Sequence, residues 1–187
     1  MADQGSEGLL SPFLRARRLA VARPYLRGRV LDVGCGSGSM ADLLPPERYV
    51  GVEPDAETLA LARKRHPQHR FLASLPDDDE FDTVASLAVI EHVVNSEGFL
   101  NDLAGRLKRV SAAQIVCTTP HPVADWIHTA GAHVGLFSRH ACEEHEELLD
   151  RRKLQDIAER IGLRLAEYRR FLMGANQLAV FGRSKES

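Results

Sequence analysis

Short apolar segments alternate with amphipathic segments along most of the chain. The apolar runs have the length of strands and span residues 29–33, 49–53, 70–74, 81–90 and 113–119. The segments with helical character span residues 11–28, 39–44, 55–66 and 96–107, and in the third of these Leu59, Leu61 and Ala62 are expected to face the core. This alternation predicts a parallel sheet with right-handed crossovers and helices on both faces.

The C-terminal part of the chain follows a different pattern. Residues 150–162 predict a helix that Asp150 caps and Gly162 ends, with an apolar stripe of Leu154, Ile157, Ala158 and Ile161. Residues 163–171 and 176–183 have the pattern of two strands, and the four residues between them are short enough for a hairpin. A mostly parallel sheet that ends in an antiparallel hairpin is therefore expected.

A single domain is expected, because the chain contains neither an internal repeat nor a low-complexity linker. Residues 1–27 are predicted to form a tail and a helix, and residues 28–187 the ligand-binding domain. The arginines of this helix could bind an anionic substrate, but a run of charge usually forms a solvated face, which is the favoured interpretation of Arg15, Arg17, Arg18, Arg23 and Arg27. The connection after the fifth strand, at about residues 121–147, is long for a compact α/β domain. It is predicted to be a lid that carries the site of a second ligand.

The stretch VLDVGCGSGSM, residues 30–40, places three glycines between a predicted strand and a predicted helix. Ligands of open α/β sheets bind at such a turn, where the strand order reverses. A dinucleotide fingerprint needs Gly or Ala where this chain has Ser39. Asp32 would repel a pyrophosphate at the helix N-terminus, whereas it would favour the ammonium and sulfonium of S-adenosylmethionine. Asp32 therefore favours S-adenosylmethionine over NAD.

A second acidic residue, Glu53, ends the second predicted strand, about 20 residues beyond the glycines. A carboxylate at this point can accept hydrogen bonds from both ribose hydroxyls. NAD and S-adenosylmethionine share that requirement, so Glu53 indicates an adenosine ligand without choosing between the two.

Four segments, VLDVGCGSG, GVEPD, FDTVASLAVIEHV and VCTTPHP, resemble successive motifs of class I S-adenosylmethionine-dependent methyltransferases, and in particular the small enzymes that include the ubiquinone-pathway O-methyltransferases. The resemblance covers residues from about 29 to 183 and implies a Rossmann-like fold with seven strands, the last antiparallel. The cofactor-binding residues that it implies are, for the methionine part, Asp32, Gly34, Cys35 and Gly36; for the ribose, Glu53 with Pro54 and Asp55 beside it; for the adenine, Ser74 and Leu75; and for the methyl group, Leu87.

The chain departs from the family pattern at two points. Many relatives have an Asp after the third strand that binds the adenine amino group, whereas this chain has LASLP there, so backbone groups are expected to take that role. Some relatives, including small-RNA 2′-O-methyltransferases, bind a divalent metal through E-x-x-E-H. This chain keeps Glu91 and His92 but has Ala88 in place of the first Glu. A hard cation needs about six oxygen-rich ligands, so no metal site is expected.

Histidines are the candidates for a catalytic base. A base is needed if the acceptor is a hydroxyl, and the histidines expected nearest the acceptor are His145, then His121 and His92. Each of them taken singly also fits a solvent-exposed position. Trp126, in the predicted lid, fits either a stacking contact with the acceptor or packing against the core.

Composition narrows the class of partner. The 187 residues have a formal net charge of −2, which disfavours a nucleic-acid substrate. The start of the chain does not have the pattern of a signal peptide, no run is apolar enough to span a membrane, and three cysteines suggest no disulfide framework, so a cytoplasmic protein is expected. The function predicted is methyl transfer from S-adenosylmethionine to a small molecule. The alternatives are a metal-assisted RNA 2′-O-methyltransferase and a cofactor-binding relative without turnover.

Overall fold

A single seven-stranded sheet forms the centre of the protein in a computed structural model that describes residues 11–77, 79–122 and 149–184. The strand order is β3-β2-β1-β4-β5-β7-β6. The strands are β1 (Val30–Val33), β2 (Tyr49–Val52), β3 (Arg70–Leu72), β4 (Thr83–Leu87), β5 (Gln114–Pro120), β6 (Leu163–Phe171) and β7 (Asn176–Arg183). The first five are parallel, and β7 runs antiparallel to both β5 and β6. The predicted mixed sheet with its C-terminal hairpin is confirmed.

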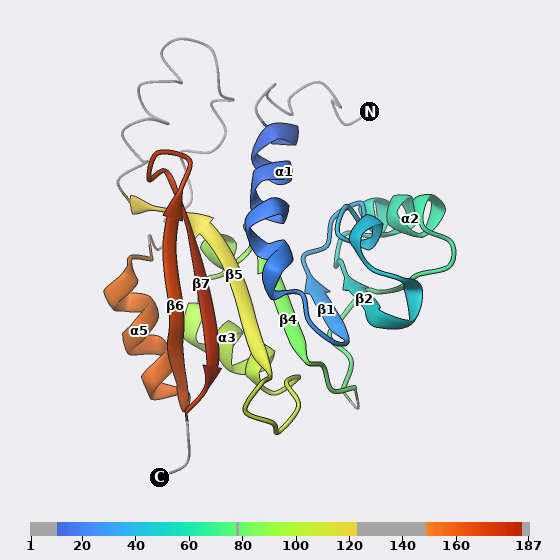
Figure 1. The fold of residues 1–187 in the computed structure, drawn as a ribbon. Coiled ribbons are helices and arrows are strands. Elements are labelled where there is room, and N and C mark those ends of the chain that lie inside the picture. Colours follow the sequence, from blue (N-terminus) through green and yellow to red (C-terminus); the bar gives the residue numbers. More distant parts are fainter. Residues whose placement is uncertain (1–10, 78, 123–148, 185–187) are drawn as a thin grey trace.

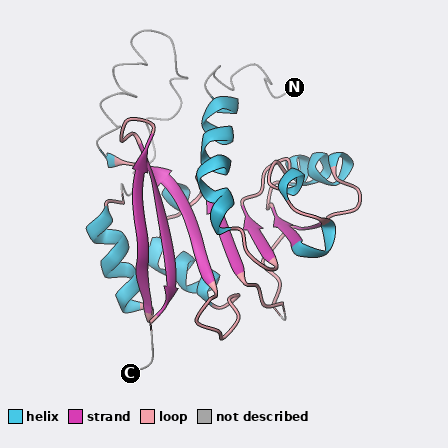
Figure 2. Ribbon diagram, viewed as in Figure 1, coloured by secondary structure: helices cyan, strands magenta, loops and turns pink. Residues whose placement is uncertain are grey.

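Helices cover both faces of this sheet (Figures 1 and 2). The four α-helices described are α1 (Ser11–Ala22), α2 (Ala56–Arg65), α3 (Ser96–Ala104) and α5 (Arg151–Arg160). On one face, Leu100 of α3 and Leu154 of α5 pack with Leu31 of β1. On the other, Ala22 at the end of α1 packs with Val116 of β5. Because side chains alternate along a strand, these two clusters lie on opposite sides of one sheet.

Polar side chains begin three of the helices. Asp55 accepts a hydrogen bond from the backbone N–H of Thr58 at 2.8 Å at the start of α2, and Asp150 accepts one from Lys153 at 2.8 Å at the start of α5. Asn95 caps α3 in the same way. These caps satisfy backbone donors that the first turn of a helix leaves unpaired. The predicted cap at Asp150 is confirmed.

Two predictions of local structure are wrong. Residues 39–44 form no α-helix, because only a 3₁₀ turn, Ala41–Leu43, fits between the positive-φ Gly38 and the proline at position 45. Leu61 does not face the core: its exposed fraction is 40%, whereas Leu59 and Ala62 are buried. The outward position of Leu61 follows from the helical period, which places it on a different side of α2 from its two neighbours.

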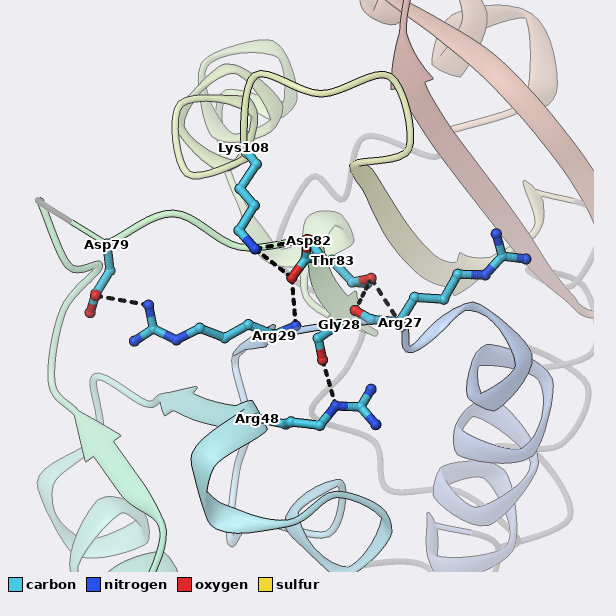
Figure 3. A network of polar contacts seen from close by, with 8 residues as sticks. All are labelled: Arg27, Gly28, Arg29, Arg48, Asp79, Asp82, Thr83 and Lys108. Carbon is cyan, nitrogen blue, oxygen red and sulfur yellow. Dashed lines mark hydrogen bonds and ion pairs between the residues drawn. The ribbon is translucent and has the colours of Figure 1, made fainter.

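A network of charged side chains holds together the amino ends of the central strands (Figure 3). Asp82, just before β4, accepts hydrogen bonds from the Arg29 backbone N–H at 2.7 Å and from the Lys108 Nζ at 2.8 and 2.9 Å. These donors, with that of Lys108 contributing most, lower the pKa of Asp82. Arg29 also reaches Asp79 at 3.0 Å. The network lies at the amino ends of the strands, whereas the glycine loop lies at their carboxyl ends. It therefore stabilises the sheet and takes no part in a site at the glycine loop.

The predicted lid lies almost wholly outside the described residues, which include only positions 121 and 122 of it. Trp126 and His145 therefore also lie outside them. No helix in the described part of the chain is both long and apolar enough to cross a bilayer.

Candidate functional site

A pocket of about 430 Å³ lies at the carboxyl ends of β1 and β4, where the strand order reverses. Its volume is within the range of small-molecule sites. Its walls come from α1, the glycine loop, α2 and the end of β4. The lining residues are Arg15, Arg18, Leu19, Asp32, Gly34, Cys35, Gly36, Ser37, Ser39, Met40, Thr58, Leu61, Arg65, Leu87 and Ala88. The sequence predicted a site at this end of the sheet.

The glycines of the loop have distinct roles. Gly34, Gly36 and Gly38 all have positive φ angles, of 74°, 55° and 87°, which favour glycine over other residues. A Cβ at Gly34 would lie 2.4 Å from Cγ2 of Val89, so Gly34 is required by packing. A Cβ at Gly36 would meet no atom within 4 Å and would occupy open space in the pocket. Gly36 is therefore the position at which a ligand can approach the backbone closely.

The open space at Gly36 predicts the effect of adding a Cβ at this position. Gly36→Ala is expected to weaken S-adenosylhomocysteine binding at least tenfold, because the new Cβ takes space that the ligand needs, while the positive φ costs roughly 1 kcal/mol of stability. Gly162→Ala is the matched control, since Gly162 also has a positive φ and an unobstructed Cβ direction but lies outside the pocket lining. Calorimetric titration and thermal melts separate the two effects. Equal affinity losses in both variants would contradict the assignment.

Asp32 lies beneath the loop and is buried. Its Oδ2 accepts a hydrogen bond from the Tyr49 hydroxyl at 2.9 Å. Burial raises the pKa of Asp32 to about 7, against the opposing effect of the Tyr49 hydrogen bond. Asp32 is thus poised between its two protonation states near neutral pH. A cation bound beside it would shift it fully to the carboxylate, so the pocket floor selects for positive charge.

Glu53 follows β2 and joins the loop to the start of α2. Its Oε2 accepts a hydrogen bond from the backbone N–H of Gly36 at 3.0 Å, and its Oε1 accepts one from the backbone N–H of Asp55 at 3.0 Å. The carboxylate is therefore held in one orientation by the backbone. Each oxygen can accept further hydrogen bonds, so the fixed carboxylate can also receive a pair of ligand hydroxyls.

The remaining predicted cofactor residues are divided between the pocket and its surroundings. Cys35 and Leu87 line the pocket; burial raises the pKa of the Cys35 thiol to about 12, which makes it an unreactive wall. Pro54 and Asp55 are exposed, and Asp55 is the cap of α2. Neither they nor Ser74 and Leu75 belong to the pocket lining: Ser74 is exposed and Leu75 packs against the main core.

Three arginines of the pocket were not predicted as site residues. Of the five arginines between positions 15 and 27, which the sequence alone favours as a solvated face, Arg15 and Arg18 line the pocket. Arg65 of α2 lines it too and donates to Ser37 Oγ at 2.7 Å. The signal available in the sequence was the spacing of three between positions 15 and 18, which places both on one side of a helix together with the half-buried Leu19.

The family of the chain follows from a match that covers most of its length. Residues 9–168 match the family described as the methyltransferase domain. The chain belongs to the class I S-adenosylmethionine-dependent methyltransferase family. The cofactor of this family, S-adenosylmethionine, is the one that the sequence predicts, and the recognition from the four motifs is confirmed.

Individual relatives of this methyltransferase family agree in fold and in part of the sequence. A protein named "Probable S-adenosylmethionine-dependent methyltransferase" from Mycolicibacterium smegmatis is 38% identical over 80 residues, which are 39% of this chain and 31% of the relative. A ubiquinone biosynthesis O-methyltransferase from Bradyrhizobium diazoefficiens is 34% identical over 91 residues, 43% of this chain and 36% of the relative. These matches span about a third of the length of the curated relatives.

A solved structure extends the likeness to the whole fold. Magnesium protoporphyrin IX methyltransferase from Synechocystis, crystallised with bound SAH, superposes with a TM-score of 0.68 over 97% of this chain and 90% of that chain. The sequence identity is 18%, so the comparison establishes a shared methyltransferase fold.

Residues 88–92 follow the end of β4 and have Ala88 where the E-x-x-E-H pattern has its first Glu. Ala88 has a φ of 61° and donates its N–H to the Thr118 carbonyl at 2.8 Å. Glu91 is buried and His92 is exposed, and the charge of His92 acts on the Glu91 carboxyl. Burial raises the pKa of Glu91. Among the described residues, no group of three or more His, Cys, Asp or Glu side chains is arranged to hold a metal ion.

Of the candidate bases, His121 and His92 belong to the described residues, whereas His145 does not. His121 follows β5, and its backbone N–H donates to the Ala175 carbonyl at 2.9 Å. Burial is the largest cause that lowers the pKa of the His121 imidazole, and the charge of Arg170 lowers it further. The charge of Asp150 acts in the opposite direction. A lowered pKa keeps the imidazole neutral near pH 7, as a general base requires. His92 lies on the 3₁₀ turn after β4, and neither residue lines the pocket.

Proposed function

We propose that this protein transfers a methyl group from S-adenosylmethionine to a small-molecule acceptor. The observation that carries the proposal is the pocket floor, where a buried Asp32 of raised pKa lies beside a glycine loop held by Glu53. A cationic nucleoside complements this floor. A pyrophosphate does not complement it, because the Asp32 carboxyl would repel the phosphates. In addition, residues 39–44, directly after the loop, form no α-helix whose N-terminus could bind them.

The pocket supports an assignment for each part of the cofactor. Asp32 would face the ammonium of the methionine part, and the arginine at position 15 would supply positive charge for its carboxylate. Glu53 would accept the ribose hydroxyls, with Pro54 and Asp55 beside it. Ser74 and Leu75 would flank the adenine, and Leu87 would lie near the methyl group. All of these roles follow the resemblance to the family, and positions in the pocket wall support those of Asp32 and Leu87.

Methyl transfer requires mainly that the protein align the acceptor with the methyl group of the cofactor. The bound cofactor supplies a methyl group that is already activated by the sulfonium. The protein then has to hold the acceptor in line with the methyl and sulfur atoms and to exclude water, which contributes several kcal/mol when the geometry is good. If the acceptor is a hydroxyl, a neutral histidine takes its proton, and His121, His92 and His145 remain the proposed candidates.

Turnover tests this function directly. The protein is expected to release S-adenosylhomocysteine when it is supplied with S-adenosylmethionine and a panel of small organic acceptors. Activity is expected to survive EDTA, because Ala88 replaces the first metal carboxylate and the described residues include no group of three or more His, Cys, Asp or Glu side chains arranged to hold a metal ion. Loss of activity in EDTA that magnesium or manganese restores would favour the metal-assisted RNA methyltransferase. Tight cofactor binding without turnover on any acceptor would favour a binding-only relative.

A further inference from the structure

Arg18 occupies a position in the pocket that the cofactor assignment leaves unused. It lies in the second turn of α1, and its Nε donates to Oδ1 of Asn176 at 3.1 Å. Asn176 is buried at the start of β7, 158 positions away along the chain. This hydrogen bond fixes the plane of the guanidinium. Among the described residues, the two terminal nitrogens of Arg18 form no hydrogen bond, so they remain available to a ligand.

No acidic side chain in the described part of the chain forms an ion pair with Arg18. The acid that acts on it electrostatically is Glu91, and burial raises the pKa of Glu91, which favours its neutral form. Burial also lowers the pKa of Arg18, but a guanidinium stays charged at neutral pH. A partly buried cation without a counter-ion is costly, and such a group at a pocket wall is characteristic of a ligand-binding role.

The surroundings of Arg18 lie at the methyl end of the proposed cofactor position. Leu87 is the register partner of Thr118, and Thr118 is the register partner of Leu178, so the three side chains share the sheet face that α1 covers. The Thr118 hydroxyl is fully buried and has no hydrogen-bond partner among the described residues. Arg18 therefore lies above a face that combines the proposed methyl position, Leu87, with an unsatisfied polar group.

The charge of the pocket lining also favours an anionic ligand near Arg18. The ionisable side chains of its lining are three arginines, one buried aspartate and the Cys35 thiol, whose raised pKa keeps it neutral. S-adenosylmethionine carries two positive charges and one negative, so its binding leaves the pocket strongly positive. A second ligand that is an anion would offset this charge, whereas a neutral or cationic acceptor would not.

We propose that Arg18, positioned by Asn176, binds the carboxylate of an organic-acid acceptor beside the reacting methyl group. The two terminal nitrogens of one guanidinium match the two oxygens of a planar carboxylate. This inference rests on the proposed methyltransferase function and adds the chemical class of its acceptor. It also separates Arg18 from the arginine at position 15, which is one turn earlier and is assigned to the carboxylate of the cofactor.

Matched acceptors test the inference. Small carboxylic acids that carry a hydroxyl, such as hydroxybenzoates and hydroxycinnamates, are compared with their primary amides in the turnover assay. Wild-type protein is expected to prefer the acids by roughly 10- to 100-fold in kcat/KM, the value of a charge-assisted hydrogen bond. Arg18→Gln is expected to abolish this preference while its affinity for S-adenosylhomocysteine stays within about threefold of wild type, because the guanidinium is proposed to bind the acceptor and not the cofactor.

A control variant and the outcomes that would contradict the inference complete the test. Arg17→Gln is the matched control, because Arg17 is an exposed arginine of the same helix that lies outside the pocket lining. It is expected to leave both properties unchanged. The inference is overturned if wild type shows no preference for acids over amides. It is equally overturned if Arg18→Gln loses S-adenosylhomocysteine affinity and keeps the acid preference, which would assign Arg18 to the cofactor. Failure of wild type to bind S-adenosylhomocysteine would instead overturn the proposed function.

Discussion

Glu53→Ala is expected to weaken S-adenosylhomocysteine binding more than a hundredfold. The carboxylate is proposed to accept two charge-assisted hydrogen bonds from the ribose, together worth about 3 kcal/mol. The substitution also removes the acceptors of the Gly36 and Asp55 N–H groups, so the loop loses the contacts that fix it. Both effects act in the same direction. Calorimetric titration of the variant with S-adenosylhomocysteine measures the change.

Glu57→Ala is the matched control for this prediction, because Glu57 is an exposed glutamate in the first turn of α2. It is expected to bind S-adenosylhomocysteine as wild type does. Thermal melts of both variants show whether the loop contacts contribute to stability as well as to affinity. An unchanged affinity in Glu53→Ala would show that Glu53 does not hold the ribose.

The affinity for S-adenosylhomocysteine is expected to rise with pH through about 7. Burial raises the pKa of Asp32 to about 7 in the free protein, and a bound ammonium favours the ionised form, so binding lowers this pKa and releases a proton. Below that pKa, each pH unit is expected to cost about tenfold in affinity. Titrations at several pH values, in buffers of different ionisation enthalpy, measure both the affinity and the proton release.

Asp32 is also expected to make the stability of the free protein depend on pH. The pKa of Asp32 is higher in the folded state than in the unfolded state, so its contribution to the free energy of unfolding is largest at low pH and is lost as pH rises through about 7. Asp32→Asn is expected to flatten both pH profiles. Asp102→Asn, which changes an exposed aspartate of α3, is expected to leave them as in wild type. A pH-dependent affinity that persists in Asp32→Asn would assign the titration to another group.

The helices, the strands and the C-terminal hairpin could be predicted from the sequence because they depend on local patterns. The hairpin of β6 and β7 needed only two strand-like runs separated by four residues, and the stripe of α5 needed only the helical period. Residues 39–44 show the limit of such reasoning. Their composition is helical, but a positive-φ glycine and a proline leave room for no more than a 3₁₀ turn.

The chemistry of the site could be predicted only in part. Asp32 and Glu53 stand at the ends of strands, where position alone indicates a role, but the raised pKa of Asp32 depends on burial and on the contact with Tyr49. Arg18 was interpreted as one of several solvated arginines. Its role depends on Asn176, which lies in the last strand, and no local pattern connects the two positions.

A comparison of two ligands tests the central claim most directly. The protein is titrated calorimetrically with S-adenosylhomocysteine and, separately, with NAD under the same conditions at pH 8, where Asp32 is ionised. The pocket floor predicts saturable micromolar binding of S-adenosylhomocysteine and no measurable heat from NAD. Micromolar binding of NAD together with no heat from S-adenosylhomocysteine would contradict the assignment of the pocket to a methyltransferase cofactor.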